Sequence, residues 1–342
     1  MLLLLKVGRI DCLDYGHYLQ SFAGLAQAAV CSAYPPVLFK SSPSDVPNTN
    51  PQGQSPNRRP LPLLEILRQV YDSPILKPVM PYDPNAFIRT RLQDALKDGR
   101  PEEIRRLAAL WWPAQPGSGS NDLDKKVEEL FWTTTLLLAG TGKPGRKPRL
   151  DFFLLHVLNA TLFLPSMLKL IPNDQSKETL LRTVLPVVLM VLEMRGRPRI
   201  QPELLMSYSA FPQPPSLGPP DQPLADPAAV GDPRDPEFVN PWAGIVASVI
   251  YAPDSHTVKA VRALFYAAQK YGSTAAGDVV GTFRNEEGQV ETHKGMGKVD
   301  GTLFVRAAGV VMDTLGWVSH GQAVGAWDRS ALGWEDAWKN ED

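Results

Sequence analysis

Apolar residues recur every three to four positions along most of the chain, a spacing that places them on one face of an α-helix. Two of these runs open with helix-start signals: Asp83 is followed by Pro84, and Gly99 is followed by Pro101 and two glutamates. The pattern predicts helices over Leu19 to Cys31, Leu61 to Tyr71, Asn85 to Lys97, Pro101 to Trp112, Leu123 to Ala139, Leu150 to Ile171, Lys177 to Glu193, Pro241 to Tyr251, Ser255 to Tyr271 and Gly301 to Val318.

Tracts rich in Pro, Gly, Ser and Asn separate these runs and cannot continue a helix. Residues 41–60 and 211–241 form the two long Pro-rich tracts, and we expect the second to be an exposed, mobile loop because it has few large apolar residues. The second tract could join two domains or cover the surface of one. We favour one helical domain over residues 1–342, since the helices on both sides of 211–241 carry residues capable of chemistry.

Signals for β-strands are few. They are confined to Val279 to Phe283 and Gln289 to Thr292, on either side of a possible hairpin turn at Glu287-Gly288. The sequence therefore predicts an all-α fold.

The charge balance argues against two classes of partner. The 342 residues include 35 Lys and Arg against 36 Asp and Glu, a net charge of −1, whereas proteins that bind nucleic acid or an anionic membrane normally carry a basic excess. Only two cysteines occur, too few for a disulfide framework, which favours a reducing cytoplasmic location. Leu150 to Leu170 is long enough to span a bilayer, but its polar residues would be costly there, so we interpret it as a core helix.

Several enzyme classes lack their motifs in this sequence. The stretch from Gly140 to Gly145 follows a predicted helix and contains a proline, so it matches neither a dinucleotide-binding loop nor a phosphate-binding loop. No Gly-x-Ser-x-Gly or Cys-x-x-Cys motif is present, and nothing indicates a Ser-His-Asp hydrolase. Histidine is the residue type left to carry chemistry.

His156 lies in the middle of a predicted helix. Helical spacing aligns it with Phe152, Asn159 and Phe163 in one stripe. An imidazole and an amide between aromatic rings would suit a flat aromatic ligand above a metal or a proton-transfer group. The alternative is a core histidine that is hydrogen-bonded to a neighbouring helix.

His256 falls in the first turn of a predicted helix whose N-cap is Asp254, after Pro253. The positive end of the helix dipole disfavours the imidazolium, so it favours a neutral imidazole able to bind a metal. Lys259 follows one turn later on the same face. The alternative is a capped surface helix on which both His256 and Lys259 are solvated.

Three blocks of sequence resemble the questin oxidase family of fungal polyketide pathways. They are Leu150-Asp-Phe-Phe-Leu-Leu-His156, Arg195-Gly-Arg-Pro198 and Asp254-Ser-His256-Thr-Val-Lys259-Ala-Val-Arg262-Ala-Leu264. Further similar segments are Ala23 to Ala29, Trp132 to Thr135 with Gly145 to Leu150, Ala326 to Asp328 and Trp334 to Trp338.

The resemblance implies a helical oxygenase of secondary metabolism that opens anthraquinone-type rings in a Baeyer-Villiger-like oxidation, with NADPH as reductant. Its substrate would be a small aromatic polyketide, and His156 and His256 would be catalytic residues. Without a flavin, an iron centre bound by imidazoles is the simplest means of activating oxygen, so His156 and His256 are candidate iron ligands or acid-base groups. The amine of Lys259, if neutral, could be carboxylated and would then add an oxygen ligand.

The chain departs from the family pattern near its start. The family has a His-Pro-x-x-His block before the helix that corresponds to Ala23 to Ala29, and here that segment reads Leu13-Asp-Tyr-Gly-His17-Tyr-Leu-Gln20. This difference predicts an N-terminally truncated chain or the loss of part of the site. The alternative function is therefore a non-catalytic relative that binds an aromatic ligand without turnover. The sequence leaves the oligomeric state open.

Overall fold

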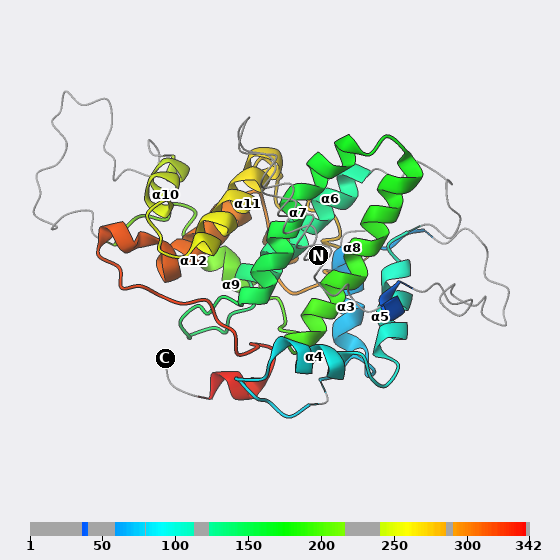
Figure 1. The fold of residues 1–342 in the computed structure, drawn as a ribbon. Helices are drawn as coiled ribbons and strands as arrows, with labels where there is room; N and C mark the ends of the chain where they lie inside the picture. The colour runs from blue at the N-terminus through cyan, green and yellow to red at the C-terminus, as the bar shows by residue number, and fades with distance from the viewer. Residues whose placement is uncertain are drawn as a thin grey trace, which may run out of the picture. The chain divides into compact units, whose positions relative to one another are not determined.

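The structure, a computed structural model, is mostly helical (Figure 1). No strand occurs in the part of the chain that it describes, which confirms the all-α prediction. The predicted helix from Leu19 to Cys31 and most of the tracts 41–60 and 211–241 lie outside that part. The described residues are 36–39, 59–78, 80–112, 123–215, 240–284 and 290–339.

The chain divides into two compact units. The first consists of the described residues within Met1–Thr134, His156–Arg199 and Arg329–Glu341, and the second of those within Thr135–Leu155 and Ile200–Asp328. The expectation of one domain over residues 1–342 stays a prediction.

The first unit is built around α8, Asp174–Met194. Helices α4 and α5 both pack against α8, and α3 packs against α5. Leu185, Leu189 and Leu192 of α8 are almost completely buried, as the continuous apolar run in this helix predicts. The other helices of this group are α3, Leu63–Asp72, α4, Ile88–Ala95, and α5, Arg100–Ala109.

Helices α6, Leu123–Ala139, and α7, Phe152–Leu170, each continue from one unit into the other. By length and composition α7 could cross a membrane, and 56% of its most apolar window is buried inside the protein. Its leucines at 154, 155, 158 and 164 have essentially no exposed surface. Such burial is what the interpretation of this segment as a core helix requires.

The second unit centres on α11, Ser255–Tyr271, and α12, Leu303–Val311. These two helices pack against each other, α10 contacts both, and α9 contacts α12 (Figure 1). Helix α10 is Pro241–Val249, with Asn240 as its side-chain cap and proline at its first position. Helix α9, Pro202–Ser207, was not predicted, since six residues are too few to establish a helical period.

Two sequence predictions differ from the structure in this unit. Between the segments predicted as strands, the described residues form only one antiparallel bridge, Phe283 with Glu291, and those around it form turns. The helix predicted from Gly301 to Val318 ends at Val311, where one π-helical turn, Met312–Gly316, begins. The Gln322 side chain, from beyond this turn, donates to the Met312 carbonyl at 3.0 Å, a contact that helical periodicity cannot reveal.

Candidate functional site

His256 stands at the start of α11, as predicted. The Asp254 carboxylate caps the helix by accepting from the His256 backbone N–H at 2.9 Å, and the same oxygen lies 2.7 Å from the imidazole Nδ1. The His256 side chain is 27% exposed. One carboxylate thus fixes both the helix start and the orientation of the imidazole ring.

The Phe152 ring packs edge-on against the His256 imidazole, with ring centroids 4.9 Å apart. Phe152 is the first residue of α7, and its backbone N–H donates to the Asp328 carbonyl at 2.8 Å. The Asp328 side chain in turn pairs with Arg149 at 2.6 Å. Backbone and side-chain bonds therefore hold the start of α7 against the segment at Asp328, and this holds the aromatic partner of His256 in place.

Asp151 caps α7. Its carboxylate accepts from the backbone N–H groups of Phe153 at 2.8 Å and Leu154 at 3.2 Å, and the residue is completely buried. The helix predicted from Leu150 would include Asp151 in its first turn, but Asp151 is the residue just before the helix. It therefore positions the helix that carries His156 through direct hydrogen bonds.

His156 is half-buried on α7 and belongs to the first unit, whereas His256 belongs to the second. Asn159, one turn further along α7, is buried, and no described residue forms a hydrogen bond with its side-chain oxygen. The hydroxyl oxygens of Thr133 and Thr135 on α6 are also buried, and no described residue forms a hydrogen bond with them. Buried polar atoms without partners are costly, so they commonly mark places where water or a ligand binds.

The predicted iron ligands do not form a complete set by themselves. Lys259 is exposed on α11, one turn after His256. Among the described residues, no group of three or more His, Cys, Asp or Glu side chains is placed to hold a metal ion. An iron bound by His156, His256 and Lys259 would thus need additional ligands. The segment that stands where the family has its His-Pro-x-x-His block lies outside the described residues.

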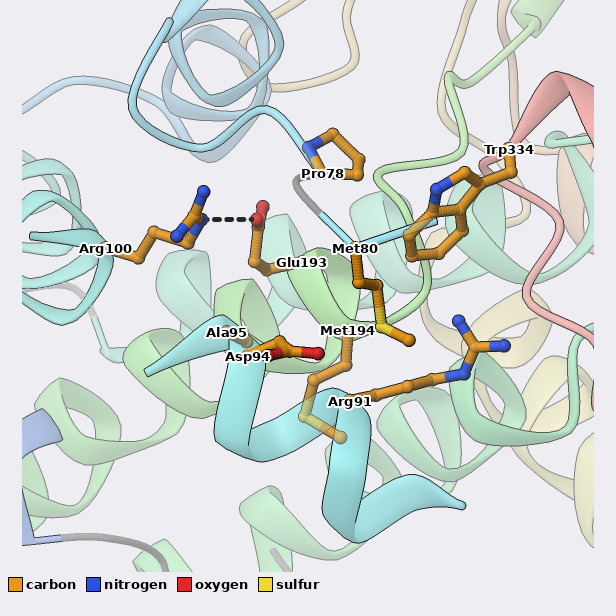
Figure 2. Close-up of a pocket in the computed structure, with 9 residues that line it drawn as sticks. All are labelled: Pro78, Met80, Arg91, Asp94, Ala95, Arg100, Glu193, Met194 and Trp334. Atoms are coloured by element: carbon orange, nitrogen blue, oxygen red, sulfur yellow. Dashed lines mark ion pairs between the residues drawn. The ribbon is translucent and has the colours of Figure 1, made fainter. Parts of the chain in front are cut away.

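The first unit contains a pocket that the sequence did not predict (Figure 2). Its cavity volume is about 20 Å³, room for roughly one water molecule. Its walls come from α4, α5, the end of α8 and two turns, and they combine two thioethers and an indole with two carboxyls and two guanidiniums. The lining residues are Pro78, Met80, Arg91, Asp94, Ala95, Arg100, Glu193, Met194 and Trp334.

Glu193 is the most unusual group in this pocket. Its side chain is 4% exposed, and it pairs with Arg100 at 3.3 Å and with Arg197 at 4.0 Å. None of the described residues donates a hydrogen bond to its oxygen Oε2. Burial raises the pKa of Glu193 to about 7, an effect that outweighs the opposing attraction of Arg197 and Arg100.

Two arginines build the pocket's walls. Arg91 lies 5.1 Å from the centre of the Trp334 ring, and its Nη2 donates to the carbonyls of Asp83 and Ser330. Arg100 donates to the Lys77 carbonyl at 3.2 Å. Arg91 thus joins α4 to the turn at Ser330, and Arg100 joins α5 to the turn at Lys77.

Sequence reasoning placed Glu193 only at the end of a predicted helix. The available signal was an acidic residue in an apolar run directly before Arg195-Gly-Arg-Pro198. Its burial depends on residues about 90 positions upstream, at Arg100, which no local pattern reveals.

Comparisons with known proteins bear on this geometry. A sequence model of the family described as Questin oxidase-like matches residues 20–264, well over half of the chain. A search of curated proteins found no match. The matched range includes the Asp151 cap, His156, the Arg195 to Pro198 turn and the His256 cap, and this chain therefore belongs to the questin oxidase-like family.

Proposed function

We propose that this protein is an oxygenase that oxidises or opens a ring of an anthraquinone-type polyketide, with His156 and His256 as catalytic residues. Membership of the family supports an oxidoreductase that acts on a small polyketide-type molecule. The observation that carries the choice of residues is the Phe152 ring, which packs on His256 and stands one helical turn before His156 on α7.

In this proposal His256 moves a proton. With the ring oriented by Asp254, the imidazole would accept the proton of a ring hydroxyl on the substrate, and the carboxylate would stabilise the imidazolium that forms. Loss of that proton makes the aromatic ring richer in electrons and thus easier to oxidise. Phe152 would limit rotation of the imidazole by packing on its edge.

The reaction needs electrons from elsewhere. Insertion of one atom of O₂ next to a carbonyl, with reduction of the other atom to water, consumes two electrons and two protons. NADPH is the proposed source. Iron is the proposed means of activating oxygen, and as the alternative to proton transfer by His256, both His156 and His256 would be among its ligands. Because the described residues alone do not complete a ligand set, we assign no step to the metal.

Oxygen uptake by the purified full chain tests the proposal. A hydroxyanthraquinone should be consumed together with O₂, and the rate should be compared with and without NADPH and after metal analysis of the protein. His320→Ala is a suitable control, because His320 bonds Ser248 at 3.0 Å and has no assigned role. Binding of the anthraquinone without any oxygen uptake would instead support the non-catalytic alternative.

A further inference from the structure

Asp328 bonds the chain before α7 with three of its own groups. Its backbone N–H donates to the Leu150 carbonyl at 2.8 Å, and its carbonyl accepts from the Phe152 N–H at 2.8 Å. Its carboxylate oxygen Oδ2 accepts from Arg149, from Nε at 2.9 Å and from Nη2 at 2.6 Å. All these residues belong to the second unit. A residue 179 positions after Arg149 thus fixes the backbone that leads into α7.

The backbone part of this contact is short. It is an isolated parallel bridge between Asp151 and Asp328 that belongs to no strand. Two neutral hydrogen bonds are a weak attachment, because each replaces bonds to water. The bonds from Arg149 are charge-assisted and therefore stronger, and the two side chains are only 28% and 13% exposed. We therefore expect the ion pair to supply much of the strength of this contact.

This contact sets the direction of the Phe152 ring. Phe152 is the first residue of α7, so its N–H has no acceptor within the helix, and it donates to Asp328 instead. The N–H of the next residue, Phe153, donates to the Asp151 carboxylate at 2.8 Å. These bonds hold the first turn of α7 against rotation, and they keep the Phe152 ring centroid 4.9 Å from that of the His256 imidazole.

The imidazole itself is held from a different element. Asp254, the N-cap of α11, lies 2.7 Å from Nδ1 of His256, and this contact involves no residue of α7. Removal of the Arg149 to Asp328 pair would therefore release the Phe152 side of the aromatic contact and leave the Asp254 side in place. Mutation can thus separate the two supports of the His256 ring.

We propose that Arg149 and Asp328 are positioning residues for the oxidation, which hold the Phe152 ring so that it keeps the His256 imidazole in its working orientation. This inference rests on the proposed role of His256 in moving a proton. Proton transfer needs a well-aligned hydrogen bond, so a displaced base lowers the rate of the step more than the affinity for the substrate. Asp328 lies beyond residues 20–264, so this role extends the site past the range that matches the family.

NMR signals of the His256 imidazole test the position of the ring, because an aromatic ring shifts the signals of the nuclei beside it. In the full chain, His256→Gln assigns these signals and Phe152→Leu gives their positions without the ring. Arg149→Met and Asp328→Ala should each move them toward the Phe152→Leu positions. Arg149→Lys, which keeps a cation and a donor, should move them less. Unchanged signals in both Arg149→Met and Asp328→Ala would overturn the proposal.

Oxygen uptake with a hydroxyanthraquinone tests the effect on the reaction. Arg149→Met and Asp328→Ala should lower kcat at least about tenfold and change KM less than about threefold, and Arg149→Lys should retain most of kcat. Wild-type kcat in both variants, or a loss confined to KM, would overturn the proposal. A wild type without any turnover would contradict the proposed function alone, and the NMR signals then decide whether the ion pair holds the Phe152 ring.

Glu203→Ala is the matched control. It removes the ion pair with Lys294 elsewhere in the same unit, so it should change neither kcat nor the His256 signals. The test variants should fold, since Trp327 beside Asp328 is buried and anchors the segment without the ion pair. Should either one unfold, Asp328→Asn takes its place: its amide oxygen still accepts a hydrogen bond without the charge, and it should show a smaller change in the same direction.

Discussion

At the scale of single residues, Asp151 shows how much a buried side chain can add to a helix start. Its carboxylate accepts from two backbone N–H groups of α7 and has no exposed surface. Asp151→Ala should lower the free energy of unfolding by about 1 to 2 kcal/mol, the upper part of the range for a lost cap, because the two donors would be left buried without partners.

Urea unfolding monitored by circular dichroism measures this loss. Asp151→Asn is the matched control, because its amide oxygen can still accept from the helix and should retain most of the stability. An Asp151→Ala variant as stable as the wild type would show that the cap contributes nothing to the helix that carries His156.

A second prediction at the scale of single residues concerns Glu193 and the pH dependence of the free energy of unfolding. Its pKa rises from an ordinary 4.5 to about 7 in the folded protein, so folding favours the protonated form. The contribution of the protonated form to stability is complete below pH 4.5 and is lost as the pH rises through 7. At about 1.4 kcal/mol per pKa unit, the loss is about 3 kcal/mol.

Glu193→Gln removes this titration. The free energy of unfolding of the wild type, minus that of the variant, should therefore fall by about 3 kcal/mol between pH 4.5 and pH 8. Urea unfolding of both proteins at several pH values gives this difference. Parallel pH profiles would mean that Glu193 has its ordinary pKa in the folded state.

At the scale of elements, the turn after α8 depends on a glycine. Gly196 has a φ of +77°, and a Cβ on it would stand 2.2 Å from Cε3 of Trp334. Gly145 has a φ of +75° with nothing within 4 Å of such a Cβ. Both glycines have a left-handed backbone conformation, but only at Gly196 would a Cβ clash with another side chain.

Alanine substitutions at Gly145 and Gly196 separate the cost of the left-handed backbone conformation from the cost of the clash with Trp334. Gly145→Ala should cost about 1 kcal/mol of stability from its backbone conformation alone. Gly196→Ala should cost about 1 to 3 kcal/mol more, because the indole must move out of its packing. Equal thermal shifts in the two variants would show that Trp334 is not held against this turn.

The elements also show what the sequence could predict. The bounds of α6 and α11 were predicted correctly because apolar periodicity and, for α11, the Asp254 cap are local signals. The π-helical turn after α12 was missed because helical periodicity does not reveal contacts such as the hydrogen bond from Gln322, which lies beyond the helix. The Glu193 pocket was missed because its walls meet only in the folded chain.

At the scale of the whole molecule, the fold class and the family follow from features spread along the chain, whereas the chemistry rests on few residues. The all-α class and the questin oxidase-like family are confirmed. The roles of His156, His256 and Lys259, the iron and the NADPH stay predictions. Local pattern could position His256 behind its cap, but periodicity cannot say which side chains of distant helices act together.

We propose that the oxidation requires both His156 and His256. The most direct measurement is the rate of oxygen uptake with a hydroxyanthraquinone for His156→Ala, His256→Ala and the double variant, with His320→Ala as control. Residues that act as a unit lose activity together, so each single variant should lose at least about 100-fold, and the double variant should lose little more. Wild-type rates in both single variants, or losses that multiply in the double variant, would contradict this account.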